Sequence, residues 1–181
     1  MLLHDGGGDA DDLLPLGQSL ARSLGTGLAL LAPQAPSGRF DGRAVLGHDW
    51  FRRDGDMIEP ASFGVSLALL ESFVIEQGRG PTVLLGQGDG ACLALALLAL
   101  APDLLAGVAS LEGHLPDLRG WGLAPGPIDR RPVLLIGRHD AAAGLSALGA
   151  VVSAAEPTAV SNGALARWLI RTLDSGSAGA G

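Results

Sequence analysis

The chain has 181 residues, 48% of them apolar and 17% charged, with a net charge of −7. This composition excludes a disordered chain, and the length fits one domain with a hydrophobic core. The acidic balance argues against a nucleic-acid partner and against binding to an anionic membrane. A single cysteine, Cys92, rules out an intramolecular disulfide and fits a reducing compartment.

Two further observations bear on the origin and location of the protein. All 12 basic residues are arginines, a bias typical of a GC-rich bacterial genome. The N-terminus lacks the basic region and the long apolar run of a signal peptide, so we expect a cytoplasmic protein.

Short apolar runs alternate along the chain with longer helical patterns. The predicted strands are Met1–His4, Leu28–Ala32, Thr82–Gly86, Leu105–Leu111, Pro132–Gly137 and Ala150–Ala154. The predicted helices are Asp11–Ser23, Pro60–Gln77, Ala91–Ala99, Ala142–Leu148 and Gly163–Asp174. The strands are apolar at successive positions, as parallel strands covered on both faces are.

The repeated strand–helix–strand pattern predicts an α/β fold with a doubly wound, mainly parallel six-stranded sheet. We expect the strand order 2-1-3-4-5-6 within one domain, residues 1–174. Residues 175–181 hold only Ser, Gly and Ala and should form a disordered tail. Residues 33–59 are polar and predict a long functional loop, with the possible role of a lid. An exposed edge of the sheet would favour a homodimer.

Three histidines follow predicted strands, at the edge of the sheet where ligands of such folds bind. His4 ends the first strand, His114 follows the fourth and His139 follows the fifth. Asp5 and Asp140 are their immediate acidic neighbours. Histidine beside a carboxylate is suited to proton transfer near neutral pH, so these residues are candidates for acid–base chemistry.

Seven segments together resemble the phospholipase/carboxylesterase branch of the α/β-hydrolases, which is similar to dienelactone hydrolases. They are Leu2–Asp9, Asp12–Leu16, Leu30–Pro33, Trp50–Arg53, Val83–Ala91, Val133–Asp140 and Ala166–Leu169. The resemblance covers nearly the whole chain in order and spacing. The family normally has one or more strands before the first of these segments, so the resemblance implies a truncated α/β-hydrolase fold.

The resemblance also implies a site, from which this sequence departs. The family has Gly-x-Ser-x-Gly at a sharp strand-to-helix turn, whereas here Gly88 stands between Gly86 and Gly90. Asp5 replaces a glycine of the oxyanion-hole turn, where a carboxylate would repel an oxyanion. Asp140 matches the acid of the catalytic triad, but no histidine follows it in the chain.

These departures leave three functions open. The first is non-hydrolytic acid–base chemistry on a small apolar organic molecule, of the cyclase, isomerase or lyase type. The second is a catalytically silent pseudo-esterase that binds a ligand or a partner. The third is a hydrolase with Asp89 as an unconventional nucleophile.

The candidate site has two groups of residues and needs no cofactor or metal. The candidate catalytic residues are His4, Asp5, His114, His139 and Asp140. The candidate substrate-binding residues are Gly6, His48, Trp50, Gly88 and Asp89. We expect them to surround one cavity above Gly88, with His4 and Asp140 within reach of it.

Overall fold

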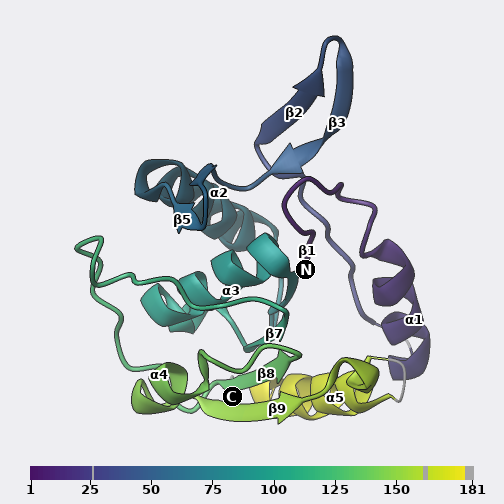
Figure 1. The fold of residues 1–181 in the computed structure, drawn as a ribbon. Coiled ribbons are helices and arrows are strands. Elements are labelled where there is room, and N and C mark those ends of the chain that lie inside the picture. The colour runs from purple at the N-terminus through teal and green to yellow at the C-terminus, as the bar shows by residue number, and fades with distance from the viewer. Residues whose placement is uncertain (26, 161–162, 178–181) are drawn as a thin grey trace.

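The computed structural model describes residues 1–25, 27–160 and 163–177. Its centre is a parallel sheet of five strands in the order β1-β6-β7-β8-β9 (Figure 1). The strands are β1 (Leu2–Leu3), β6 (Val83–Gln87), β7 (Gly107–Leu111), β8 (Pro132–Ile136) and β9 (Val151–Ala155). The helices are α1 (Leu14–Leu24), α2 (Pro60–Gln77), α3 (Gly88–Leu100), α4 (Ala142–Ala147) and α5 (Ala164–Ser177), with short 3₁₀ turns at Pro102–Leu104 and Pro157–Ala159.

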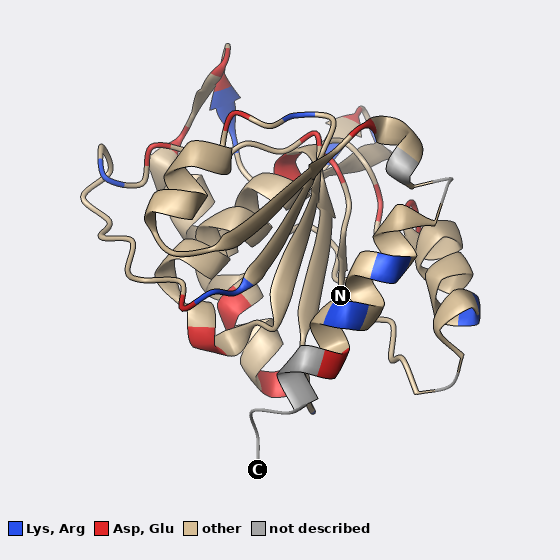
Figure 2. Ribbon diagram, turned by 90° about the horizontal axis from the view of Figure 1, so that it is seen from below, with Lys and Arg blue, Asp and Glu red and all other residues tan. Residues whose placement is uncertain are grey.

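Helices cover both faces of this sheet, and alternate strand residues form two cores. Leu84 and Leu135 pack with α2, α3 and α4 on one face. Leu85 and Leu134 pack with α1 and α5 on the other. The strands of the sheet carry no charge, and the charged residues lie mainly in loops and on helices (Figure 2). The expected α/β class with a doubly wound parallel sheet is therefore confirmed.

Helix α3 is the central helix of the fold. Every residue from Gly90 to Ala99 is buried, since α3 packs on β6 and β7 and is covered by α2. The apolar run that predicted a buried helix is therefore explained by this position. Over the described residues, no helix combines the length and the apolar character that crossing a membrane requires.

The prediction of a six-stranded sheet was wrong for one strand, residues 28–32. Residues 28–32 are not a strand of the sheet, although Leu2 N donates a hydrogen bond to Leu31 O at 2.8 Å. This segment would pair with β1. Because β1 is only two residues long, the two segments cannot form a regular ladder of hydrogen bonds. The remaining strands keep the expected relative order.

The prediction of one long loop over residues 33–59 was also wrong, because this segment forms two antiparallel hairpins. β2 (Ser37–Asp41) pairs with β3 (Ala44–Asp49), and β4 (Arg53–Asp54) pairs with β5 (Met57–Ile58). Gly42 and Gly55 take positive φ angles of 57° and 59° at the two turns. Each glycine follows an aspartate, which is a known hairpin signal. The β2–β3 hairpin projects from the body of the molecule (Figure 1).

The expected boundary between domain and tail shifts as well. Helix α5 continues to Ser177, beyond the expected end at residue 174. Backbone hydrogen bonds of the preceding turn extend a helix even through poor helix formers, and helix ends are the least certain part of a sequence prediction. The rest of the expected tail, residues 178–181, lies outside the described residues.

Phe63 packs α2 against two loop segments, the one between β3 and β4 and the one after β7. It is fully buried, and its ring lies 5.0 Å from that of Phe51 and 5.1 Å from that of Trp121. We expect Phe63→Ala to lower the free energy of unfolding by about 3–5 kcal/mol, because it leaves a cavity. Phe40→Ala, at a side chain that is 64% exposed, should change it by less than about 0.5 kcal/mol. Urea denaturation of both variants measures this, and equal effects would contradict the packing described.

Candidate functional site

The turn between β6 and α3 has the geometry of a nucleophile elbow. Gly88 begins α3 directly after β6 and has a φ of 50°, a left-handed conformation that favours glycine. Its flanking glycines are tightly enclosed. A Cβ at Gly86 would lie 2.5 Å from Ala91 N, and one at Gly90 would lie 2.5 Å from Leu3 O. The segment therefore forms the sharp strand–turn–helix that exposes a nucleophile in α/β-hydrolases.

The carboxylate of Asp5 lies over this turn. Its Oδ1 accepts hydrogen bonds from Gly6 N at 2.7 Å and from Asp89 N at 2.9 Å. A Cβ added at Gly88 would overlap this carboxylate. In α/β-hydrolases the N–H after the nucleophile and an N–H of the first loop form the oxyanion hole. Asp5 thus places a negatively charged oxygen between the two corresponding N–H groups of this chain.

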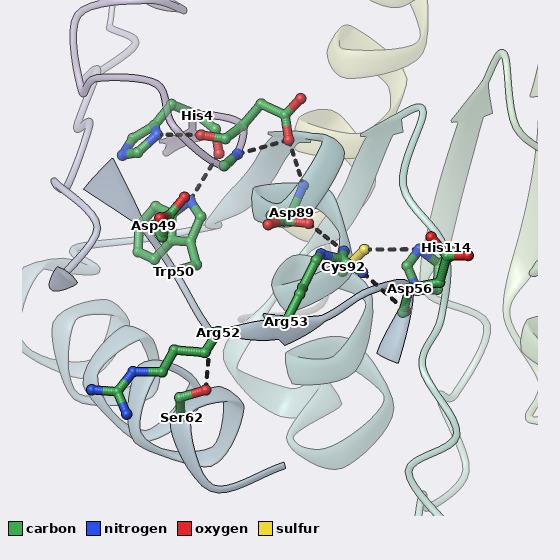
Figure 3. A network of polar contacts seen from close by, with 12 residues as sticks. His4, Asp49, Trp50, Arg52, Arg53, Asp56, Ser62, Asp89, Cys92 and His114 are labelled. Carbon is green, nitrogen blue, oxygen red and sulfur yellow. Dashed lines mark hydrogen bonds and ion pairs between the residues drawn. The ribbon is translucent and has the colours of Figure 1, made fainter. Parts of the chain in front are cut away.

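Asp89 is held on the other side of the turn by Arg53 (Figure 3). Arg53 Nη2 lies 2.5 Å from Asp89 Oδ1, and the guanidinium also stacks on Phe51, 5.1 Å from the ring centre. Burial lowers the pKa of Arg53, but the hydrogen bond and the charge of Asp89 outweigh it and raise the pKa above its ordinary value. Arg53 therefore stays protonated, and the Asp89 carboxylate is engaged by it rather than open to a substrate.

His4 is a buried packing residue in this structure (Figure 3). It is 1% exposed, and its ring lies 5.1 Å from that of Trp50. Ala35 N donates to its Nε2 at 3.1 Å, so Nδ1 carries the proton and donates to Asp5 O at 2.7 Å. Trp50 Nε1 donates to the backbone carbonyl of His4 at 2.8 Å. Both ring nitrogens are thus used to fix the loops after β1 and before the hairpin.

His114 contacts Cys92, which lies on the first turns of α3. The His114 Nδ1 atom is 3.2 Å from Cys92 Sγ (Figure 3). Burial raises the pKa of the Cys92 thiol to about 11, so the group is a protonated thiol at neutral pH. Burial and the positive charges of Arg138 and Arg53 lower the pKa of His114. The imidazole that contacts the Cys92 thiol is therefore neutral.

The remaining candidates lie apart from the Asp5–Asp89 contact. His139 Nε2 donates to Ala155 O at 3.1 Å, and Asp140 pairs with Arg138 at 2.8 Å. His48 lies on the β2–β3 hairpin, where its Nδ1 accepts a hydrogen bond from Gln34. Over the described residues, no group of three or more His, Cys, Asp or Glu side chains is arranged to hold a metal ion.

A cavity of about 530 Å³ lies elsewhere in the fold. Its walls come from α1, α5, the residues 27–31, the segment 77–82 between α2 and β6, and the strands β1 and β6. The side chains that line it are mostly apolar and include Leu2, Leu20, Leu30, Leu85, Trp168 and Leu169. None of the candidate catalytic residues contributes to this cavity.

Two residues of the site escaped the sequence interpretation. Arg53 had been noted only as part of a resemblance, and Cys92 carries no motif. The one signal for Cys92 is its spacing of four residues from Gly88 at the start of a helix, which puts both on one helical face. Arg53 reaches Asp89 because β4 lies beside the first turn of α3, a tertiary contact that no local pattern indicates.

With this geometry in view, comparisons with known proteins define the fold. No family model matches the sequence, and no curated protein matches it either. Solved structures do match. A variant of SOBER1 from Arabidopsis thaliana aligns over 95% of this chain and 98% of its own, with 19% identity and a TM-score of 0.75.

Two bacterial structures agree with this match. A carboxylesterase from Mesorhizobium loti has 24% identity and a TM-score of 0.73, over 93% of this chain and 86% of its own. A Bacillus cereus carboxylesterase has 19% identity and a TM-score of 0.75, over 94% and 87%. The chain therefore has an α/β-hydrolase fold of the esterase type, as the sequence resemblance implied. At these identities the likeness defines the fold and not the activity.

The overlap between Asp5 and the position of a Gly88 side chain is open to a double-mutant test. Gly88→Ala should be strongly destabilising in the wild-type background, because the new Cβ meets the Asp5 carboxylate. In an Asp5→Gly background only the strain of the positive φ should remain, about 1–2 kcal/mol. We expect a coupling of at least about 1 kcal/mol between the two sites, measured by urea denaturation. Additive costs would contradict the contact.

Proposed function

We propose that this protein is a catalytically silent α/β-hydrolase, a pseudo-esterase that binds a small apolar molecule. One observation carries the first half of the proposal: Asp5 Oδ1 accepts the N–H groups of Gly6 and Asp89 at 2.7 and 2.9 Å. A carboxylate fixed between these donors excludes the oxyanion that ester hydrolysis would form there. Gly88 supplies no hydroxyl to attack an ester.

The hydrogen bonds of the other candidate catalytic residues favour an inactive site over one that performs acid–base chemistry. His4 has no free nitrogen to accept a proton from a substrate, since Asp5 O and Ala35 N occupy both. His139 donates to a backbone carbonyl. A non-hydrolytic acid–base reaction would therefore rest on Nδ1 of His139, which this bond leaves as an acceptor, or on His114, whose lowered pKa leaves it neutral and able to act as a base. This is the second candidate function.

The third candidate, hydrolysis through Asp89, is disfavoured by its ion pair. A carboxylate nucleophile has to approach the substrate, and Arg53 holds Asp89 at 2.5 Å. If Asp89 moved towards a substrate, the Arg53 guanidinium would lose its partner, and the favourable energy of a partly buried ion pair would be lost. We therefore rank this candidate below the other two.

The expected chemistry of the silent site is simple to measure. Wild-type protein should hydrolyse nitrophenyl esters no faster than Asp89→Asn, and neither should be labelled by a fluorophosphonate probe. His114→Gln is the matched variant for one of the two remaining bases. Robust labelling of any serine, or a rate that falls about 10²-fold in either variant, would reject a silent site.

The second half of the proposal, the binding of a small apolar molecule, rests on the cavity beside α1 and α5. Its volume of about 530 Å³ lies within the range of small-molecule sites, and its walls are mostly apolar. The mostly apolar walls favour an apolar body for the ligand, because a buried polar group would lose its hydration there, and among the described residues Arg79 is the one charged side chain of the lining. The ligand would thus bind away from the Asp5 carboxylate.

We expect decanol, an uncharged apolar probe, to change the tryptophan emission of the wild-type protein, since Trp168 lines the cavity. Leu30→Arg places a charge in the cavity wall and should abolish the change. Ile170→Arg is the matched control, because Ile170 is 38% exposed and lies on α5 outside the cavity lining. Saturable binding that Leu30→Arg leaves intact would reject this site.

A further inference from the structure

The cavity beside α1 and α5, which we call the α1–α5 cavity, has an apolar interior and a polar rim. The segment 77–82, between α2 and β6, forms the rim and contributes the polar side chains of Gln77, Arg79 and Thr82. Buried side chains of the sheet, α1 and α5 form the interior: Leu2, Leu20, Leu85, Leu165, Trp168 and Leu169. In small-molecule sites of this kind the apolar walls hold the body of the ligand, and a few polar groups fix its orientation.

Two glycines show where the cavity is closed and where it is open. On α1, a Cβ added to Gly17 would lie 2.6 Å from Leu2 Cδ1, so the helix packs directly on β1 there. At the rim, a Cβ added to Gly80 would have no atom of the described residues within 4 Å, apart from its chain neighbours. Gly80 is exposed and is the immediate neighbour of Arg79. The cavity is therefore closed beside α1 and opens to solvent beside Arg79.

Arg79 gives the rim a positive charge. The chain has 19 acidic residues, yet none of them is among the described residues that line the cavity. Arg79 is exposed, and no ion pair involves it within the part of the chain that the structure describes; Glu76, the acid nearest to it in the sequence, is not paired with it. A guanidinium keeps its charge at every physiological pH and binds a carboxylate through two parallel hydrogen bonds.

We infer that the ligand of the α1–α5 cavity is a fatty-acid-like monocarboxylate, with its alkyl chain in the interior and its carboxylate beside Arg79 at the rim. This inference rests on the proposed function, which makes the cavity a ligand site, and it adds the head group and the orientation of the ligand. Each methylene group buried in the interior should tighten binding by about four-fold. A carboxylate at the open rim keeps part of its hydration, so it avoids the cost of burying a charge in the interior.

The single charge of the rim favours a head group with a single negative charge. A phosphate monoester carries close to two negative charges at neutral pH, and Arg79 would neutralise only one of them. The other would face a protein whose net charge is −7. A cationic head group would be repelled by the guanidinium, and an alcohol would gain no ion pair from it. A carboxylate is therefore the head group that this rim fits best.

The test compares ligands of equal chain length on the full-length protein, by isothermal titration calorimetry at neutral pH. Wild type should bind decanoate about five-fold more tightly than decanol, the upper range for an exposed ion pair. Arg79→Gln should remove this preference and leave the dissociation constant of decanol within about two-fold. Arg43→Gln is the matched control, because Arg43 is an exposed arginine outside the cavity lining and its loss changes the net charge equally.

The outcomes separate this inference from the proposed function. If decanol binds but decanoate binds no more tightly, or if Arg43→Gln weakens decanoate as much as Arg79→Gln does, the head-group assignment is overturned and the cavity remains a site for apolar molecules. If neither ligand binds saturably, the cavity is not a ligand site and both proposals fail.

The sign of the charge has its own test. Arg79→Glu should reverse the order of affinities, so that decylammonium binds this variant more tightly than decanoate does, because the rim then carries a negative charge. Wild type should bind decyl phosphate no more tightly than decanoate. An unchanged order in Arg79→Glu, or a clear preference of the wild type for decyl phosphate, would show that a single positive charge at the rim does not select the ligand.

Discussion

One carboxylate oxygen connects the two halves of the candidate site. Asp5 Oδ1 joins the loop after β1 to the first turn of α3, across a sequence separation of 84 residues. The turn can accept it because Gly88 has no side chain and its φ of 50° is free of strain. One of the two N–H donors to this oxygen, Asp89 N, lies in the first turn of α3, and the start of a helix is a favourable place for a negative charge. The contact therefore stabilises the turn with the same donors that would otherwise bind an oxyanion.

The rest of the site is arranged around this contact. His4 and Trp50 fix the backbone that carries Asp5, since the His4 ring is held by backbone groups on both sides and Trp50 donates to its carbonyl. Arg53 neutralises Asp89, the second acid at the turn. Without Arg53, two carboxylates would face each other at the head of one helix and repel. The hairpins between α1 and α2 thus supply the partners that make this acidic turn stable.

The comparison with esterase structures separates the fold from the chemistry. The chain matches carboxylesterase structures over more than 90% of its length, so the sheet, the elbow and the order of helices are those of that fold. Under the proposed function, the scaffold remains while a glycine and an aspartate replace the reacting groups, and the ligand binds in the α1–α5 cavity.

The sequence by itself determined the α/β class, because periodic apolar runs are local signals. The order of the parallel strands and the elbow at Gly88 came from the resemblance to the esterase family. The prediction for residues 28–32 was wrong, because strand pairing depends on the length of the neighbouring strand. The prediction for residues 33–59 was wrong, because their Asp-Gly turns were interpreted as part of a loop and not as hairpin turns.

Only the tertiary structure decided how the candidate residues are used. His4 and Asp5 are adjacent in sequence, yet His4 is 1% exposed in the core and Asp5 lies over the turn at Gly88. Likewise, the pattern of α2 predicted a helix but not which of its apolar faces would remain uncovered. The local periodicity of apolar residues predicts which face of a helix or strand a side chain lies on. Its partner depends on which distant segments pack there, and that is set by the fold as a whole.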